Sequence, residues 1–174
     1  MKKLIQLSMM ALAIASLFTV TGCSTKGGYG DGATIGENGD EWGPGDMPMS
    51  GEDFTKYPRV NQQFTPVYFA YDNYQIPSGE YGKIDSVVRF MQGDASIVLI
   101  VEGHCDERGT IEYNLSLGEY RAQSVRSHMV NSGISSDRIQ TTSYGKERPA
   151  VQGSGEAAWS KNRRGEFALY KRGK

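Results

Sequence analysis

The chain contains little cysteine and little histidine, two of each among 174 residues. A zinc site needs three or four ligands, and His104 and His128 are accompanied by no second cluster at ligand spacing. If Cys23 is chemically blocked, as argued below, Cys105 has no partner within the chain, and a disulfide-based fold is excluded. The sequence therefore predicts neither a metal site nor a cofactor.

An excess of charge of one sign is also missing. The formal net charge is −1, and removing +2 for Lys2 and Lys3 and −4 for residues 24–60 leaves +1 for residues 61–174. A nearly neutral domain gives no electrostatic reason to expect a nucleic-acid partner. No internal repeat of 20–50 residues is visible, so a solenoid is not indicated.

Cys105 stands between His104 and Asp106, an order that raises the possibility of a cysteine–histidine nucleophile. Neighbouring side chains on an extended backbone point to opposite faces, so His104 and Cys105 are not expected to converge. We therefore expect Cys105 to be a small packed residue.

The N-terminus reads as a secretory signal peptide over residues 1–22, with Lys2 and Lys3 before an apolar stretch from about Leu7 to Val20. A transmembrane anchor is the alternative, but a spanning helix needs roughly 20 apolar residues. The junction Val-Thr-Gly-Cys at 20–23 resembles a bacterial lipobox. That resemblance implies N-acyl and S-diacylglycerol groups on Cys23, and Ser24 after it favours the outer membrane.

Residues 24–60, with the lipidated Cys23 before them, are predicted to form a flexible tether. Nine of these 37 residues are glycine, and seven acidic residues outnumber three basic ones. No helical or strand period is visible, and such a composition buries too little apolar surface to order itself. The folded domain is accordingly expected to span residues 61–174.

That domain alternates predicted strands and helices in the order β-α-β-α-β-α-β. The patterns indicate an α+β fold, a mixed four-stranded sheet with parallel pairs covered by helices, and leave the strand order open. Gly165 is expected to weaken or bulge the last strand. The predicted elements are strands at 67–71, 96–102, 138–144 and 164–170, and helices from about 78 to 93, 111 to 131 and 156 to 161.

The most informative stretch runs from Val101 to Arg121. A buried strand ends in a loop dense in ionisable groups, and a helix follows on which Asn114 and Arg121 lie about two turns apart. Asp106 offers a carboxylate to a cation, while Arg108 and Arg121 offer guanidinium forks to a carboxylate. The combination suits a zwitterion such as the head of an amino acid.

The domain resembles the peptidoglycan-binding domain of the outer-membrane protein A (OmpA) family, and within it the lipoproteins of the Tol-Pal system. The resemblance is carried by V-Y-F-A-Y-D-N-Y-Q-I at 67–76, V-E-G-H-C-D-E-R-G-T-I-E-Y-N-L-S-L-G at 101–118, Y-R-A-Q-S-V at 120–125, S-Y-G-K-E-R-P at 143–149 and W-S-K-N-R-R at 159–164.

This resemblance implies noncovalent binding of the peptide stem of peptidoglycan, chiefly of its diaminopimelate. Asp106 would take the ligand ammonium and Arg121 a ligand carboxylate, and without ligand the two are expected to pair with each other. Arg164 is either near the site or structural. The further residues that match the binding site of the family are Tyr71, Asp72, Arg108, Asn114 and Leu117.

The resemblance also implies an outer-membrane lipoprotein with its domain in the periplasm, tethering the membrane to the wall and acting in envelope integrity and cell division. A TolB-like propeller protein would be a second partner, on a surface overlapping the wall site. Two alternatives stay open: a wall hydrolase using Asp106 and Glu107, and a protein-interaction module without wall affinity. The adjacent carboxylates do not have the separation that glycosidases use, which argues against the hydrolase.

Overall fold

The computed structural model describes residues 51–173. The predicted signal peptide, Cys23 and most of the tether lie outside these residues, so those predictions are not addressed by the structure. Within residues 51–173 no helix combines the length and the apolar character that crossing a bilayer demands.

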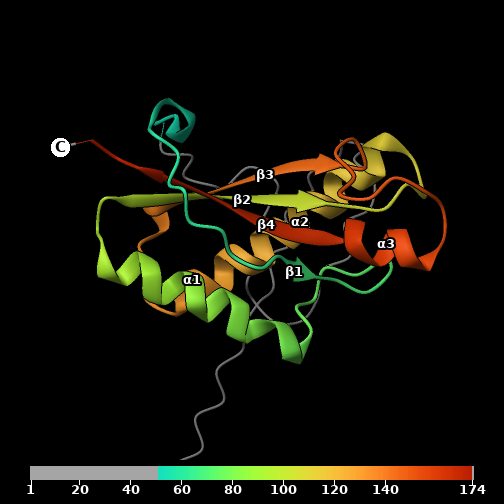
Figure 1. Ribbon diagram of the computed structural model, residues 1–174, viewed down its shortest axis with the longest axis horizontal. Coiled ribbons are helices and arrows are strands. Elements are labelled where there is room, and N and C mark those ends of the chain that lie inside the picture. The colour runs from blue at the N-terminus through green and yellow to red at the C-terminus, as the bar shows by residue number, and fades with distance from the viewer. Residues whose placement is uncertain (1–50, 174) are drawn as a thin grey trace, which may run out of the picture. The chain divides into compact units, whose positions relative to one another are not determined.

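The sheet has four strands in the order β1-β4-β2-β3, with β2 and β3 parallel and β4 antiparallel to both of its neighbours (Figure 1). The mixed four-stranded sheet is therefore confirmed. The structure also gives the strand order, which the sequence left open. The strands are β1 Val67–Tyr68, β2 Ile97–His104, β3 Ile139–Gly145 and β4 Arg164–Lys171.

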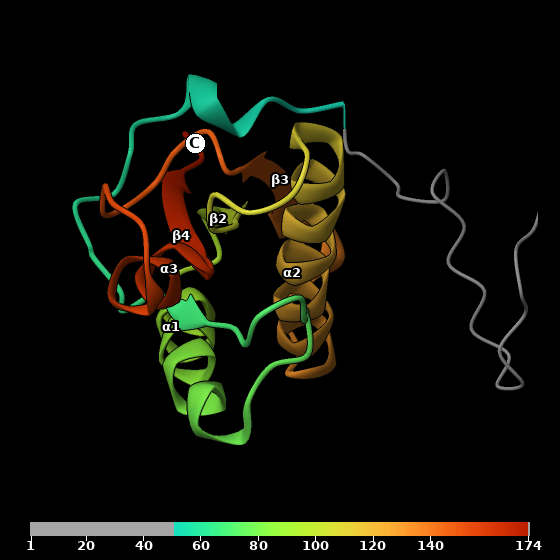
Figure 2. The same ribbon diagram turned by 90° about the vertical axis from the view of Figure 1, so that its right-hand side faces the viewer.

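Two long helices cover one face of this sheet, and they enclose the main core with it (Figures 1 and 2). The predicted α1 stripe, Ile84, Val88 and Met91, is buried there. Thr110 caps α2 by accepting a hydrogen bond from the backbone N–H of Tyr113. The helices are α1 Tyr81–Gly93, α2 Ile111–Asn131 and the short α3 Glu156–Asn162, with 3-10 turns η1 Phe54–Lys56, η2 Ser78–Glu80 and η3 Ser136–Arg138.

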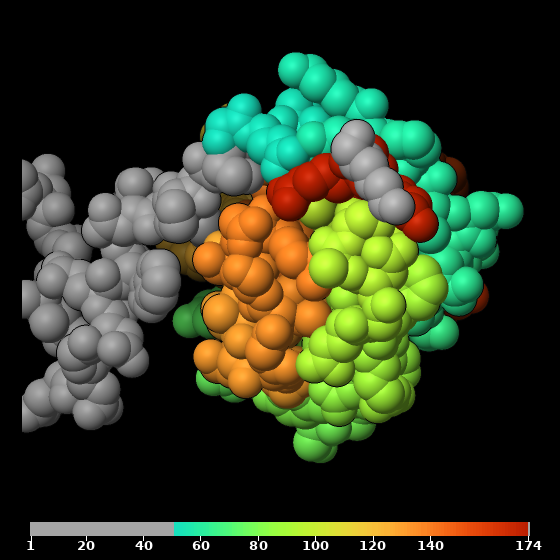
Figure 3. Space-filling view, turned by 90° about the vertical axis from the view of Figure 1, so that its left-hand side faces the viewer, coloured from blue at the N-terminus to red at the C-terminus, as the bar shows by residue number. Residues whose placement is uncertain are grey.

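The structured domain begins earlier than residue 61, which corrects the predicted end of the tether. Phe54 is fully buried on the sheet face opposite the helices, against Val98, Ile100 and Ala168. The following residues bind β4 through backbone hydrogen bonds, Val60 to Leu169 at 2.9 Å and Lys171 to Pro58 at 3.0 Å. Figure 3 shows this segment lying along the end of β4. Phe54 is one of four aromatic residues spread without a period through the glycine-rich stretch, and such a pattern does not predict this packing.

The expectation of a weak or bulged last strand is wrong. Gly165 pairs with Val67 on one side and with Gly103 on the other, in a continuous β4. A register shift does occur in the sheet, but between Gly103 and His104, where β2 meets β3. Pairing on both sides keeps β4 regular despite the conformational freedom of its glycine.

Helix α2 approaches β2 unusually closely at a pair of glycines. A Cβ atom on Gly103 would lie 1.9 Å from the carbonyl oxygen of Gly118, and one on Gly118 would lie 2.3 Å from Oγ of Ser143. A side chain at Gly103 would require the backbone to move, whereas one at Gly118 would displace the Ser143 side chain and crowd the Gly103 carbonyl oxygen at 3.1 Å. This contact brings the first half of α2 against the end of β2, where the candidate site lies.

Candidate functional site

A cavity of about 220 Å³ opens where β1 and β2 end and α2 begins. The structure brings all seven residues that the resemblance assigned to binding into its wall. The lining consists of Tyr71, Asp72, Cys105, Asp106, Arg108, Gly109, Tyr113, Asn114, Leu117 and Arg121. Cys105, Gly109 and Tyr113 are the members that the sequence did not assign, although all three lie inside the stretch that carries the resemblance.

Three segments hold the pocket together. The β1 side contributes Tyr71 and Asp72, and Asp72 adopts a positive φ of 50° and accepts a hydrogen bond from the Tyr113 hydroxyl of α2. The loop after β2 is fixed by Asn114, whose side-chain amide donates to the carbonyls of Arg108 at 2.8 Å and Thr110 at 3.0 Å. Asn114 is thus both a wall of the pocket and the brace of its charged loop.

Arg121 forms the base of the pocket, and its side chain is completely buried. Nε donates to the carbonyl of Asn73 at 2.9 Å, Nη1 to that of His104 at 2.8 Å, and Nη2 to that of Ala70 at 3.1 Å. Among residues 51–173 no carboxylate lies within ion-pair distance of this guanidinium. Burial lowers the pKa of Arg121, yet an arginine stays protonated at neutral pH.

The predicted pair between Asp106 and Arg121 is therefore wrong. Asp106 is held instead by Arg108, with Nε to Oδ1 at 3.0 Å and Nη2 to Oδ2 at 2.6 Å, and by Nη1 of Arg163 at 3.3 Å from Oδ2. Burial alone raises the pKa of Asp106, but the hydrogen bonds from Arg108 and Arg163 outweigh that effect and lower it. The pocket thus contains an anion and a separate cation.

Arg108 is held in place by aromatic stacking as well as by Asp106. Its Cζ atom lies 3.9 Å from the ring centre of Tyr71 and 4.0 Å from that of Trp159. Trp159 in turn donates from Nε1 to Glu107 at 3.0 Å. Sandwiching between two rings pre-orients the guanidinium fork for planar recognition of a carboxylate.

Arg163 contacts Asp106 of the pocket and Arg164 does not, although neither arginine lines the pocket wall. Arg163 precedes β4 and donates to Asp106, to Glu156 and, through Nε at 3.0 Å, to the carbonyl of Phe69. Arg164 pairs with Glu166 and is not part of the pocket wall. Consecutive side chains on extended backbone face opposite sides, so Arg163 and Arg164 at the start of β4 are not expected to point toward the same site.

Cys105 is a packed residue, as expected. It is buried, and burial raises the pKa of its thiol to about 11, so it is protonated at neutral pH and a poor nucleophile. His104 does not converge with it but lies on the other side, near Tyr144. The Sγ atom of Cys105 lies 3.3 Å from Nη1 of Arg121.

The charged loop lacks the acid that hydrolysis of a glycosidic bond requires. The pKa of Asp106 is lowered, and hydrogen bonds from Ser154 and Trp159 lower that of Glu107. A general acid needs a raised pKa to hold its proton near neutral pH. Neither carboxyl group is suited to that role.

Comparison with known proteins places the chain in a family. The model of the OmpA family matches residues 68–163, which is more than half of the chain, and the chain belongs to that family. Many of the curated relatives bear the name peptidoglycan-associated lipoprotein.

One such lipoprotein, from Pasteurella multocida, is 44% identical over 110 residues, covering 63% of this chain and 73% of the relative. Another, from Pseudomonas aeruginosa, is 38% identical over 164 residues, covering 90% and 93%. The crystal structure of the peptidoglycan-associated lipoprotein from Burkholderia pseudomallei matches with a TM-score of 0.59 and 31% identity, over 62% of this chain and 90% of that one. The α+β sheet described above is thus the fold of this family.

Proposed function

We propose that the chain binds peptidoglycan noncovalently through the diaminopimelate of its peptide stem. The observation that carries this is the pocket in which the Asp106 carboxylate and the Arg121 guanidinium lie without pairing with each other. The end of a diaminopimelate side chain bears an ammonium and a carboxylate on one carbon. A pocket that keeps its own opposite charges apart can bind both. The names of the relatives support peptidoglycan as the polymer that is bound.

Binding requires an exchange at Asp106. Both carboxylate oxygens of Asp106 already accept hydrogen bonds from the Arg108 guanidinium. The ligand ammonium would take the place of this guanidinium, and the hydrogen bond from Arg163 to Asp106 would be kept. The Arg108 guanidinium, which is only partly buried, is then free to face the ligand carboxylate. Arg121 adds a fixed positive charge at the base, which is strongest where water is excluded.

The experiment is a titration of soluble stem peptides, of the diaminopimelate and lysine types, into the full chain in detergent. Asp106→Asn removes the negative charge and should lower the affinity for the diaminopimelate stem about ten- to hundred-fold, the equivalent of roughly 1.5–3 kcal/mol. Asp85→Asn is the matched control, because Asp85 of α1 pairs with His128 of α2 and is not in the pocket. A lysine-type stem lacks the distal carboxylate and should bind similarly weakly. Equal affinity for both stems, or unchanged affinity of a folded Asp106→Asn, removes this ligand from the pocket.

The proposal includes a membrane anchor at Cys23. N-acyl and S-diacylglycerol groups on that residue would fix the chain to the outer membrane, with the domain in the periplasm and residues beyond Cys23 bridging to the wall. Cys23→Ser should leave an uncleaved precursor that does not label with palmitate. Normal processing and labelling of that variant would contradict the anchor.

A protein partner is a second candidate function, favoured by aromatic side chains around the pocket. Tyr71, Tyr74, Tyr113 and Tyr120 are each about half exposed or more. Exposed tyrosines are typical of protein interfaces, and a TolB-like propeller protein of a Tol-Pal system acting in cell division is the partner that the resemblance implies. Cosedimentation with purified sacculi separates the two functions, since a pure protein-interaction module stays in the supernatant.

A further inference from the structure

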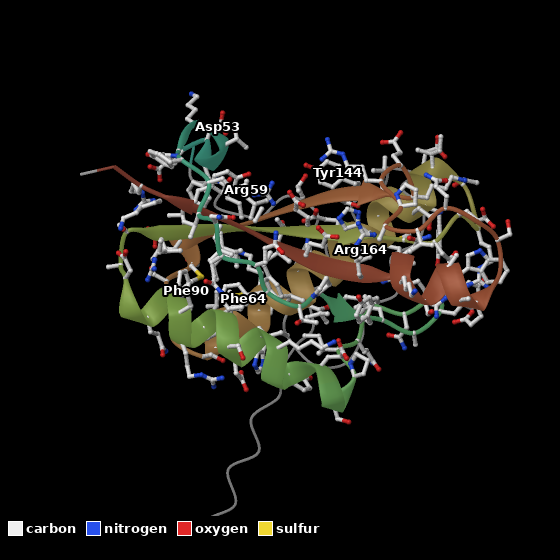
Figure 4. All side chains as sticks on the ribbon, viewed as in Figure 1. Asp53, Arg59, Phe64, Phe90, Tyr144 and Arg164 are labelled. Carbon is white, nitrogen blue, oxygen red and sulfur yellow. The ribbon has the colours of Figure 1, made fainter. Side chains whose placement is uncertain are left out.

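The sheet face opposite the helices carries a second cluster of ionisable residues. Glu102 of β2 is paired in register with Glu166 of β4, and His104 follows Glu102 by two residues on the same strand. One ligand atom from each of these three residues lies within 4.8 Å of those from the other two. None of the three lines the pocket. Figure 4 shows Arg59, Tyr144 and Arg164 on this face, with Phe64 and Phe90 on the helix side.

His104 is the unusual member of the cluster. It is 2% exposed, and neither Nδ1 nor Nε2 makes a hydrogen bond to any group within residues 51–173. The backbone of Arg148 and the ring of Tyr144 lie close by without supplying one of good geometry. A buried imidazole left without partners costs about 1–3 kcal/mol, so its retention asks for an explanation.

Unpaired polar atoms favour a ligand here. A neutral imidazole keeps a lone pair on one ring nitrogen, and within residues 51–173 neither ring nitrogen of His104 is engaged in a hydrogen bond. Only Glu166 of the two carboxylates has an ion-pair partner within residues 51–173, namely Arg164 at Oε1. The other oxygen of Glu166 and both of Glu102 remain for a cation.

We propose that Glu102, His104 and Glu166 bind a divalent cation of the zinc class, which would link β2 to β4. One imidazole and two carboxylates form the three-ligand set of an open zinc site. Ligand atoms about 2.1 Å from zinc in a tetrahedron lie roughly 3.4 Å apart. The three ligand atoms, now within 4.8 Å of one another, would reach that separation through small rotations of their side chains. An imidazole nitrogen selects Zn²⁺ or Co²⁺ over Mg²⁺ and Ca²⁺.

Nearby arginines limit the strength of such a site. Arg59 and Arg148 act on Glu102 by their charge, and Arg164 holds one oxygen of Glu166. The cation therefore competes with Arg164 for Glu166. Counting cysteines and histidines along the sequence missed this cluster, because strand pairing alone brings Glu166, 64 positions later, opposite Glu102.

The test uses the untagged full chain in detergent, stripped of metal and titrated with ZnCl₂ by calorimetry. We expect one saturable Zn²⁺ per chain, and an affinity at least tenfold lower in Glu102→Gln, Glu166→Gln and His104→Asn. His128→Asn is the matched control, because His128 is the only other histidine of the chain. This substitution should leave the affinity for Zn²⁺ unchanged. Ca²⁺ is the control cation and should not compete at equal concentration.

A readout on the unmodified chain covers the case in which a variant fails to fold. Zinc should shift the ring-proton NMR signals of His104 and leave those of His128 in place, and Co²⁺ should give a visible d–d absorption band. Zinc should also raise the melting temperature of the wild type and not that of Glu102→Gln. Absence of saturable binding, or shifts at His128 alone, overturns the proposal, and so does equal affinity in the folded variants.

Discussion

The carboxylate of Asp106 accepts a bidentate pair of hydrogen bonds from the guanidinium of Arg108, at 3.0 Å and 2.6 Å. The bonds make Asp106 easier to ionise than an ordinary aspartate and hold Arg108 over the mouth of the pocket. They also mean that the protonation of Asp106 affects both the stability of the loop and the binding of a cation.

The first prediction concerns pH. Because the folded pKa of Asp106 lies below its ordinary value of 3.8, its ionised form stabilises the fold above that value. The contribution disappears as the pH falls through the lowered pKa. The difference in unfolding free energy between wild type and Asp106→Asn should stay constant from about pH 7 to pH 5 and shrink below about pH 4. Urea unfolding at a series of pH values measures it, and a difference that shrinks on going from pH 7 to pH 5 contradicts the assignment.

The second prediction separates folding from binding at Arg121. Its guanidinium binds three backbone carbonyls, so Arg121→Ala leaves buried acceptors without donors. We expect a loss of about 3 kcal/mol or more in the free energy of unfolding. Arg89→Ala, at an exposed position of α1, should change stability by less than about 0.5 kcal/mol. Denaturant unfolding of both variants tests this, and an Arg121→Ala as stable as Arg89→Ala would show that these hydrogen bonds do not matter.

The third prediction uses the contact between α2 and β2. Gly118→Ala places a methyl group 2.3 Å from Oγ of Ser143 and should destabilise the domain by about 1–3 kcal/mol. Gly82→Ala lies in α1 with no heavy atom within 4 Å, and should stabilise by roughly 0.5–1 kcal/mol through helix propensity. Opposite shifts in melting temperature are the expected result. Equal shifts would mean that the close approach relaxes freely.

The fourth prediction concerns the segment before residue 61. Phe54 is fully buried against the open sheet face, and its replacement by alanine should cost about 3–5 kcal/mol. A fragment of residues 61–174 should accordingly melt at a lower temperature than one of residues 51–174. Circular dichroism on the two fragments measures the difference. Equal melting temperatures would show that this segment adds no stability.

Sequence patterns predicted the element order and most of the core. Apolar residues at helical spacing located α1, and the continuous run from Ile97 to Val101 located β2, because both patterns record burial directly. Strand order could not be predicted in this way, since hydrogen bonding between strands leaves no trace in the period of one strand. The first strand is also shorter than predicted, because after Tyr68 the backbone of Phe69 binds Arg163 instead of a neighbouring strand.

For the candidate site, too, the sequence predicted one part and not another. The motifs identified residues that share a pocket, because five of the seven lie on one loop and the helix after it, and the other two, Tyr71 and Asp72, follow β1. They did not predict which charges pair: Asp106 is held by Arg108 and by Arg163, which lies 57 positions away, and Arg121 has no carboxylate partner within residues 51–173. Spacing along one element cannot reveal a contact made by another.

The position of β4 determines when the domain can form. It is the last strand of the chain, yet it lies between β1 and β2, and Arg163 just before it completes the surroundings of Asp106. A nascent chain that ends before residue 163 lacks one of the two inner strands of its sheet and the Arg163 contact to Asp106. Folding of the complete sheet must therefore wait until the C-terminal strand has been synthesised, however early the helices and the other strands are available.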